Sequence, residues 1–254
     1  MPHAYPTPAH ERAADAIVAW FAEQPETEAV LLTNSCARGT ATPDSCLDMQ
    51  VMVRPDLRDD VDARWTAFMD TSPAIHALAD AGRWSELHLD VGDGVFTPGE
   101  IAHEGVDHLE IRVGNLLAYS VPLLTRGDRL ERLRAAWLPF YGDELRAERL
   151  AAARYWVLSY LDRIPWYVGR DLHFQAFDRL YRALGYFLLG LHVSRRTYPI
   201  SYDKWIREQV AGNLGLPELY ERLPRLFELR RLESDELVGK AADLRALVEA
   251  YVVE

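Results

Sequence analysis

The stretch TNSCARGTATPDSCLDMQVMV, residues 33–53, contains a turn-rich connection between two short apolar runs. The run AVLLT at 29–33 leads into the connection, and MQVMV at 49–53 follows it and ends at Arg54-Pro55. Short apolar runs that are bounded by turn residues are typical of buried strands. The stretch therefore predicts the order strand, turn, short helix, turn and strand.

Helical and extended patterns surround this stretch in the first half of the chain. Residues 10–24 carry an apolar stripe at helical spacing, and DDVDARWTAFMD at 59–70 also has helical character. ELHLDV at 86–91 and HLEIRV at 108–113 alternate polar and apolar residues, as half-buried strands do. We therefore predict a mixed sheet with helices for residues 1–124.

Long segments with helical periodicity replace the alternating pattern after about residue 125. They cover residues 128–138, 143–163, 172–193, 202–212 and 234–252. Within 172–193 the apolar residues recur at three- and four-residue steps, which is the spacing of a helix face that packs in a core. The predicted fold class is therefore α+β, with a mixed domain at 1–124 followed by a helical domain at 125–254.

Composition narrows the classes of partner and compartment. The chain has 28 basic and 39 acidic residues, and the resulting net charge of −11 disfavours nucleic acids and anionic membranes as partners. Cys36 and Cys46 are too few for a disulfide framework and are expected to be free thiols in a reducing compartment. The first twelve residues lack the pattern of an export signal, and no uncharged apolar run reaches eighteen residues. We therefore expect a soluble, cytoplasmic protein.

The opening stretch resembles the nucleotidyltransferase superfamily signature, a Gly-Ser turn that is followed downstream by Ser-Asp-x-Asp. The resemblance is strongest to the branch that contains the aminoglycoside-type adenylyltransferases. It is carried by Asn34-Ser35, Ala37-Arg38-Gly39, Ala41, Pro43 and Ser45-Cys46-Leu47-Asp48. This resemblance implies transfer of a nucleotidyl group from a nucleoside triphosphate, most plausibly ATP, to a hydroxyl of a small molecule, with Mg²⁺ as the cofactor.

The resemblance also assigns roles to individual residues. Nucleotidyl transfer requires a polyanion to be held while metal ions meet the attacking and leaving oxygens. Ser35 and the backbone amides after it would hold the terminal phosphates, with Asn34 and Arg38 in the same turn. Asp48 would be the second carboxylate of the metal pair, because carboxylates two residues apart on a strand share one face.

We expect a third carboxylate to come from a neighbouring strand, and Asp90 is the candidate. In the alternating pattern of 86–91, Leu87, Leu89 and Val91 would face the core, whereas Glu86, His88 and Asp90 share the opposite face. His88 is then a candidate catalytic neighbour of Asp90. The alternative is an ordinary strand edge with solvated polar residues.

The region GRDLHFQAFDRLYRALGYFLLGLHVSRRTYPISYDKWI, residues 169–206, also resembles related small-molecule nucleotidyltransferases. In those proteins a basic residue before a tryptophan can reach the triphosphate. Lys204 would fill that role, with Arg195 and Arg196 nearby. The alternatives are arginines that cap a helix C-terminus and a lysine that is simply solvated.

Two positions depart from the family pattern. Asn34 stands where the family has the turn glycine, and Asn accepts a positive φ more readily than most residues. Cys46 stands where the family has the first metal-binding aspartate, and a thiol is a poor ligand for Mg²⁺, which prefers oxygen. Asp44 could replace that carboxylate only through a rearranged turn.

These departures leave two functional hypotheses. In the first, Asp48 and Asp90 retain enough metal affinity for nucleotidyl transfer to a small molecule. In the second, the fold has been repurposed for metal-independent catalysis or for binding a ligand or partner only. Cys46 could then act as a nucleophile that is activated by His88, although a buried, inert thiol is the alternative for both Cys46 and Cys36.

Overall fold

The computed structural model describes residues 5–102 and 105–253, and the chain divides into two compact units. The first unit contains the chain up to Phe96 together with Val113–Leu138. The second contains Thr97–Arg112 and the chain from Pro139 onward. The boundary expected between residues 124 and 125 lies inside the first unit, and the structure assigns the segment 97–112 to the second.

A four-stranded sheet forms the framework of the first unit, in the order β3-β2-β1-β4. Its strands are β1 (Thr27–Leu32), β2 (Leu47–Val53), β3 (Leu87–Gly92) and β4 (Val121–Thr125). β1 pairs antiparallel with β2 and β4, whereas β2 and β3 are parallel. The predictions of β1, β2 and β3 are confirmed, and with the helices that follow they confirm the α+β fold class. β4 was not predicted.

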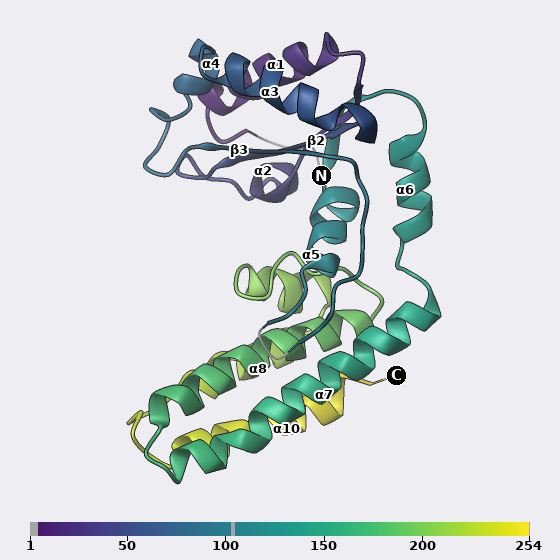
Figure 1. Cartoon of the computed structure of the whole chain (residues 1–254). Coiled ribbons are helices and arrows are strands. Elements are labelled where there is room, and N and C mark those ends of the chain that lie inside the picture. Colours follow the sequence, from purple (N-terminus) through teal and green to yellow (C-terminus); the bar gives the residue numbers. More distant parts are fainter. Residues whose placement is uncertain (1–4, 103–104, 254) are drawn as a thin grey trace. The chain divides into compact units, whose positions relative to one another are not determined.

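Figure 1 shows the helices α1, α3 and α4 over one face of this sheet and α2 on the other. Alternate residues of β2 form the face that α1 and α3 cover, where Leu47, Met49 and Val51 pack with Phe21 and Trp65. The helical elements of this unit are α1 (Pro8–Ala22), α2 (Asn34–Arg38), η1 (Pro55–Leu57), α3 (Arg58–Met69), α4 (Pro73–His76), the π-helical turn η2 (Gly114–Ala118) and α6 (Arg129–Trp137).

The segment HLEIRV was predicted to be a strand, and this prediction is wrong. Residues Leu109–Val113 form the helix α5, which crosses from the second unit into the first. Leu109, Val113, Leu116 and Leu117 are all buried, and this spacing is that of one helix face. Three polar residues gave the segment its polar–apolar alternation. His108 and Arg112 are exposed, but Glu110 between them is fully buried, so the alternation did not mark a single solvent-facing side.

Long helices form the second unit, as predicted for most of the second half. Figure 1 shows α7, α8 and α10 packed along one another. The helical elements are α7 (Asp143–Val168), α8 (His173–Ser194), the π-helical turn η3 (Glu208–Asn213), α9 (Pro217–Arg222), η4 (Pro224–Phe227) and α10 (Glu236–Tyr251). Of the helix expected at 202–212, residues 202–204 form bends, and helical structure begins at residue 206 and continues as η3.

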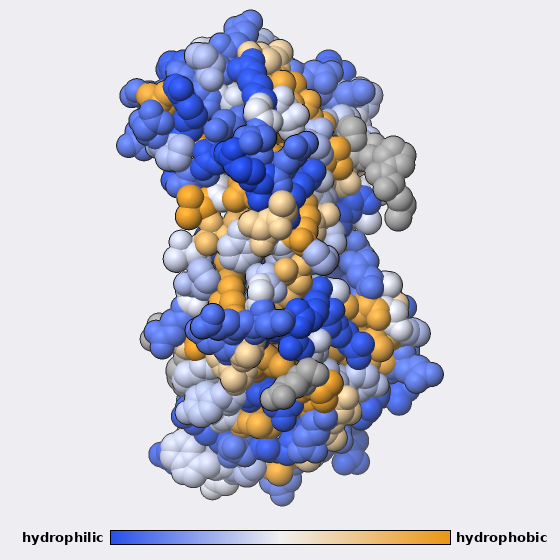
Figure 2. Space-filling view, turned by 90° about the vertical axis from the view of Figure 1, so that its right-hand side faces the viewer, coloured by the Kyte–Doolittle hydropathy of each residue, from blue (hydrophilic) through white to orange (hydrophobic). Residues whose placement is uncertain are grey.

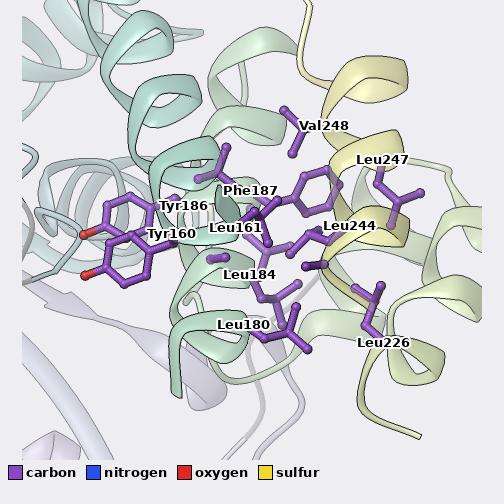
Figure 3. Close-up of a cluster of buried hydrophobic side chains, with 14 of the residues drawn as sticks. Tyr160, Leu161, Leu180, Leu184, Tyr186, Phe187, Leu226, Leu244, Leu247 and Val248 are labelled. Atoms are coloured by element: carbon purple, nitrogen blue, oxygen red, sulfur yellow. The ribbon is translucent and has the colours of Figure 1, made fainter. Parts of the chain in front are cut away.

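The core of this unit is the predicted apolar face of α8. Figure 3 shows Leu180, Leu184 and Phe187 of α8 directed toward Leu244 and Leu247 of α10. All five side chains are almost completely shielded from solvent. Burial of side chains of this size contributes about 1.5–3 kcal/mol each, so hydrophobic packing holds the three long helices together.

A buried ion pair attaches the segment 97–112 to α7. The Arg149 guanidinium donates to both carboxylate oxygens of Glu110, from Nε at 2.8 Å and from Nη2 at 2.6 Å. Arg149 Nη1 also donates to the carbonyl of Gly99 at 2.9 Å and lies 3.0 Å from Asp107 Oδ2. The hydroxyl of Tyr141 donates to Glu110 Oε1 at 2.9 Å. The charges of this pair are therefore compensated by several hydrogen bonds, as a buried pair requires.

The surface view in Figure 2 shows hydrophilic residues over much of one face, with hydrophobic residues in several separate patches. Among residues 5–102 and 105–253, none of the helices combines the length and the apolar character needed to cross a bilayer.

Candidate functional site

The turn that follows β1 has the backbone form that its sequence requires. Thr33 precedes α2, Asn34 has a φ of 51°, and Gly39 ends the helix with a φ of 71°. Asn34 therefore takes the left-handed conformation that glycine adopts most readily, as its position in the motif led us to expect. The amide of Thr33 donates to the carbonyl of Asp48 at 3.0 Å, which fixes the turn against the start of β2.

The pairing of β2 with β3 places the candidate carboxylates on one face. Asp48 lies beside His88, and Gln50 lies beside Asp90. Met49 and Val51 alternate with them and enter the core on the other face. From a strand spacing of about 4.8 Å and a rise of about 6.6 Å over two residues, the α-carbons of Asp48 and Asp90 are about 8 Å apart. The predicted shared face of Asp48, His88 and Asp90 is thus present.

A hollow of about 850 Å³ lies beside β3 in the first unit. Asp48, His88 and Asp90 contribute to its lining, together with Asp62 and Thr66 of α3. A space of this size can hold a small organic ligand. The polar face of the two strands is therefore accessible.

His88 bridges two carboxylates on this face. Its Nδ1 lies 3.3 Å from Asp48 Oδ1, and its Nε2 lies 2.9 Å from Glu86 Oε1. The Asp48 side chain is only 17% exposed, whereas those of His88 and Glu86 are 55% and 68% exposed. Asp48 thus holds the imidazole from its shielded side, and the opposite ring nitrogen lies against the exposed Glu86 carboxylate.

Cys46 lies directly before β2, and its thiol donates to the carbonyl of Trp84 at 3.4 Å. Burial raises the pKa of the Cys46 thiol, and the negative charge of Asp48 raises it further. The sulfur and one ligand atom each of Glu86 and His88 all lie within 4.8 Å of one another. The thiol is therefore half-buried and protonated at neutral pH, but it lies next to two other potential metal ligands.

Cys36 has no comparable surroundings. It is fully buried in α2, and its thiol lies 3.7 Å from the carbonyl of Cys46. Burial, with smaller contributions from Asp48 and Cys46, raises its pKa to about 12. These surroundings are those of an inert packing residue.

Asp44 does not supply the carboxylate that Cys46 lacks. Its Oδ1 accepts a hydrogen bond from the backbone amide of Arg83 at 2.8 Å, which ties the turn at 42–45 to the loop before β3. The buried His10 supports the same turn, because its Nε2 donates to the carbonyl of Ser45 at 2.9 Å. The hydroxyl of Thr7 lies 2.8 Å from His10 Nδ1 and fixes the ring orientation.

The remaining nucleotide-binding candidates differ in their solvent exposure and in the unit to which they belong. Ser35 is buried at 8% exposure, and Arg38 is half-buried at the end of α2. Lys204 is exposed in the second unit, directly before Trp205, and its backbone carbonyl accepts a hydrogen bond from Gln209 Nε2. The roles of Ser35, Arg38 and Lys204 toward a triphosphate remain predictions.

The donor atoms around Asp48 fit Mg²⁺ poorly. Mg²⁺ requires near-octahedral oxygen coordination, and Cys46, at the position of the first carboxylate in the motif that residues 34–48 resemble, carries a thiol. The second, Asp48, has one oxygen against the imidazole of His88. Asp90 is paired with Gln50 in the strand register, so the side chain beside it offers an amide oxygen and not a thiol or imidazole.

Sequence reasoning did not select Glu86 or His10 as site residues. Glu86 was assigned to the polar face, but its proximity to Cys46 depends on the register of two parallel strands that are forty residues apart. The backbone amide of Leu47 donates to the carbonyl of Glu86 at 2.9 Å and fixes that register. A local pattern contains no information on this pairing.

A second hollow, of about 440 Å³, lies within the second unit. Tyr181, Arg182, Tyr186, Tyr202 and Asp203 contribute to its lining. The hydroxyl oxygen of Tyr202 is shielded from solvent and has no hydrogen-bond partner among the described residues.

Comparisons with known proteins give distant similarity to solved structures only. No family model and no curated protein matches the sequence. Among solved structures, the chain is similar to a nucleotidyltransferase-like protein from Exiguobacterium sibiricum, with 15% identity and a TM-score of 0.46. The alignment covers 94% of this chain and 74% of that chain. We infer neither the fold nor the activity of this chain from that similarity.

Proposed function

We propose that this protein binds a nucleoside triphosphate in its first unit and transfers the nucleotidyl group to a hydroxyl of a small molecule. The observation that carries the proposal is the placement of Asp48 and Asp90 on one accessible face of neighbouring strands, next to a turn whose Asn34 keeps a positive φ. The resemblance of residues 34–48 to nucleotidyltransferases supports the same assignment. ATP is the first triphosphate to test.

In the proposed reaction, the acceptor oxygen forms a bond to the α-phosphorus while the bond between the α- and β-phosphates breaks. Pyrophosphate leaves, and the hydroxyl proton passes to an exposed carboxylate, for which Asp90 is the candidate. Ser35 and the turn amides would orient the triphosphate. The negative net charge of the chain favours a cationic acceptor.

A second candidate is a repurposed site that binds a ligand without nucleotidyl transfer. The observation that favours it is the thiol of Cys46 in place of a carboxylate, together with the engagement of Asp48 by His88. Under this alternative, the site keeps its hollow and loses the affinity for a metal-bound triphosphate.

Binding and turnover assays distinguish the two candidates. The full chain is titrated with ATP in the presence of Mg²⁺, Mn²⁺ or Zn²⁺, and pyrophosphate release is followed with a panel of aminated and hydroxylated acceptors. We expect metal-dependent ATP binding that is lost in Asp48→Asn and Asp90→Asn. The control is Asp80→Asn, which removes an exposed carboxylate outside the site.

The variant Cys46→Asp gives the sharper result. An increase in pyrophosphate release would show that the thiol limits a nucleotidyltransferase site. If wild type and Cys46→Asp both fail to bind ATP with every cation, the proposed function is wrong.

A further inference from the structure

The ends of two parallel strands bring three different metal-binding groups together. Cys46 precedes the first residue of β2 and Glu86 precedes the first residue of β3, and Leu47 is paired with Leu87. The same register places His88 beside Asp48. The sulfur of Cys46, a carboxylate oxygen of Glu86 and a ring nitrogen of His88 consequently lie within 4.8 Å of one another.

The chemistry of these donors indicates the type of cation. Thiolate, imidazole and carboxylate are the three protein ligands of Zn²⁺, which binds them at about 2.0–2.3 Å in tetrahedral geometry. These bond lengths correspond to ligand–ligand distances of about 3.3–3.8 Å. Small rotations of the exposed Glu86 and His88 side chains would bring the present separations into that range, since His88 Nε2 and Glu86 Oε1 are now 2.9 Å apart and all three donor atoms lie within 4.8 Å of one another.

A carboxylate also lies behind the imidazole, where a metal-bound histidine usually has one. Asp48 Oδ1 is 3.3 Å from His88 Nδ1, while Nε2 lies toward Glu86. In zinc sites, the ring nitrogen that does not bind the metal commonly donates its hydrogen to a carboxylate, which fixes the tautomer and the ring orientation. The shielded Asp48 is in the correct place for this role.

We propose that Cys46, Glu86 and His88 bind a divalent cation of Zn²⁺ type, and that Asp48 orients His88. The fourth position faces solvent, because Glu86 and His88 are the most exposed members of the group. Three protein ligands with an open position are the arrangement of catalytic rather than structural zinc sites. In this proposal, Cys46 is a ligand for a different metal and not merely a lost magnesium ligand.

A role of the bound Zn²⁺ in a reaction rests on the proposed function. Binding of the cation itself requires only these four side chains. Metal binding and nucleotidyl transfer can therefore succeed or fail separately: zinc binding without pyrophosphate release would reject the function alone, and release without a zinc site would reject this inference alone.

The test uses the full chain, stripped of metal by a chelator and then supplied with Zn²⁺ or Co²⁺. After removal of excess metal, elemental analysis should find one Zn²⁺ per chain, and Co²⁺ should give the near-ultraviolet absorption of a cobalt–thiolate bond. A large excess of Mg²⁺ should leave the bound Zn²⁺ in place, since Mg²⁺ prefers oxygen ligands.

Substitutions identify the ligands. We expect Cys46→Ser to abolish the cobalt–thiolate absorption and to weaken Zn²⁺ binding by more than about 100-fold, whereas Asp48→Asn weakens it by about 10–100-fold. Cys36→Ser, which removes the other thiol, and His76→Gln, which removes an exposed histidine elsewhere, are the matched controls. The inference is wrong if Cys46→Ser keeps wild-type Zn²⁺ affinity, if Cys36→Ser removes the absorption, or if the chain retains no Zn²⁺.

Discussion

The buried ion pair between Arg149 and Glu110 allows a quantitative test of how the segment 97–112 is held in the second unit. Arg149 is 2% exposed and Glu110 is fully buried. In the variant Arg149→Met, Glu110 loses both guanidinium contacts, at 2.6 and 2.8 Å, and keeps the hydroxyl of Tyr141. A buried carboxylate without its cation destabilises a protein by about 3–5 kcal/mol, which is the expected loss of unfolding free energy.

The double variant Arg149→Met/Glu110→Leu separates the cost of an unpaired buried carboxylate from the net contribution of the ion pair to stability. Replacing both charges with apolar side chains removes the uncompensated carboxylate, so the double variant should be more stable than Arg149→Met. The effects of Arg149→Met and Glu110→Leu on the free energy of unfolding should therefore not add, and their interaction energy should be about 0.5–3 kcal/mol or more. This cycle tests the charge pairing separately from the change in side-chain volume.

Urea unfolding, followed by far-ultraviolet circular dichroism and by protease cleavage within 97–112, measures these effects. The matched control is Arg182→Met, which removes an arginine from the exposed pair with Asp178, each side chain being 47% exposed. An exposed pair contributes about 0.2–1 kcal/mol. If Arg149→Met costs no more than Arg182→Met, or if the single effects add, the account of the buried pair is wrong.

Three further changes test other parts of the fold. Burial lowers the pKa of His192 from 6.5 to about 3, so protonation favours the unfolded chain and the free energy of unfolding falls as the pH drops below 6.5. Between pH 7 and pH 5, wild type should therefore lose about 2 kcal/mol more of this free energy than His192→Gln, as measured by urea titration. Gly190→Ala places a methyl group 2.7 Å from a Val252 methyl and should cost about 1–3 kcal/mol in thermal unfolding, less when combined with Val252→Ala. Because Asn34 has a φ of 51°, Asn34→Val should cost about 1–2 kcal/mol, whereas Asn34→Gly should remain within about 1 kcal/mol of wild type; equal effects of Val and Gly would contradict the turn geometry.

The strands that border the turn at 33–46 could be predicted because their apolar runs are short and end in turn residues. Leu47, Met49 and Val51 enter the core at alternate positions, so the period of two is visible in the sequence. The same reasoning failed for α5, because one of the three polar residues in its pattern, Glu110, is buried against Arg149. Because a long-range ion pair allows Glu110 to be buried, the local alternation of polar and apolar residues wrongly indicated a half-exposed strand.

The strand β4 and the assignment of 97–112 to the second unit depend on similar long-range contacts. β4 has only one fully polar position, Thr125, and carries Pro122 in the edge strand of the sheet, where a missing amide is tolerated. In the segment 97–112, Ile101 packs with the helices of the second unit. Composition alone does not show to which unit such a segment belongs.

Asn34 and Cys46, the two positions that differ from the motif that residues 34–48 resemble, have different physical consequences. Asn34 preserves the backbone conformation of a turn glycine, so this change leaves the turn in place. Cys46 alters the donor atoms, and the register of β2 with β3 adds Glu86 and His88 to it. His88 contacts Asp48 on one side and the carboxylate of Glu86 on the other. This ordered arrangement favours a site with a different metal over a site that has only lost its ligands. The decisive comparison is therefore Cys46→Asp: if this variant exchanges zinc preference for magnesium preference, residue 46 selects the metal, whereas an unchanged preference would place that selection elsewhere.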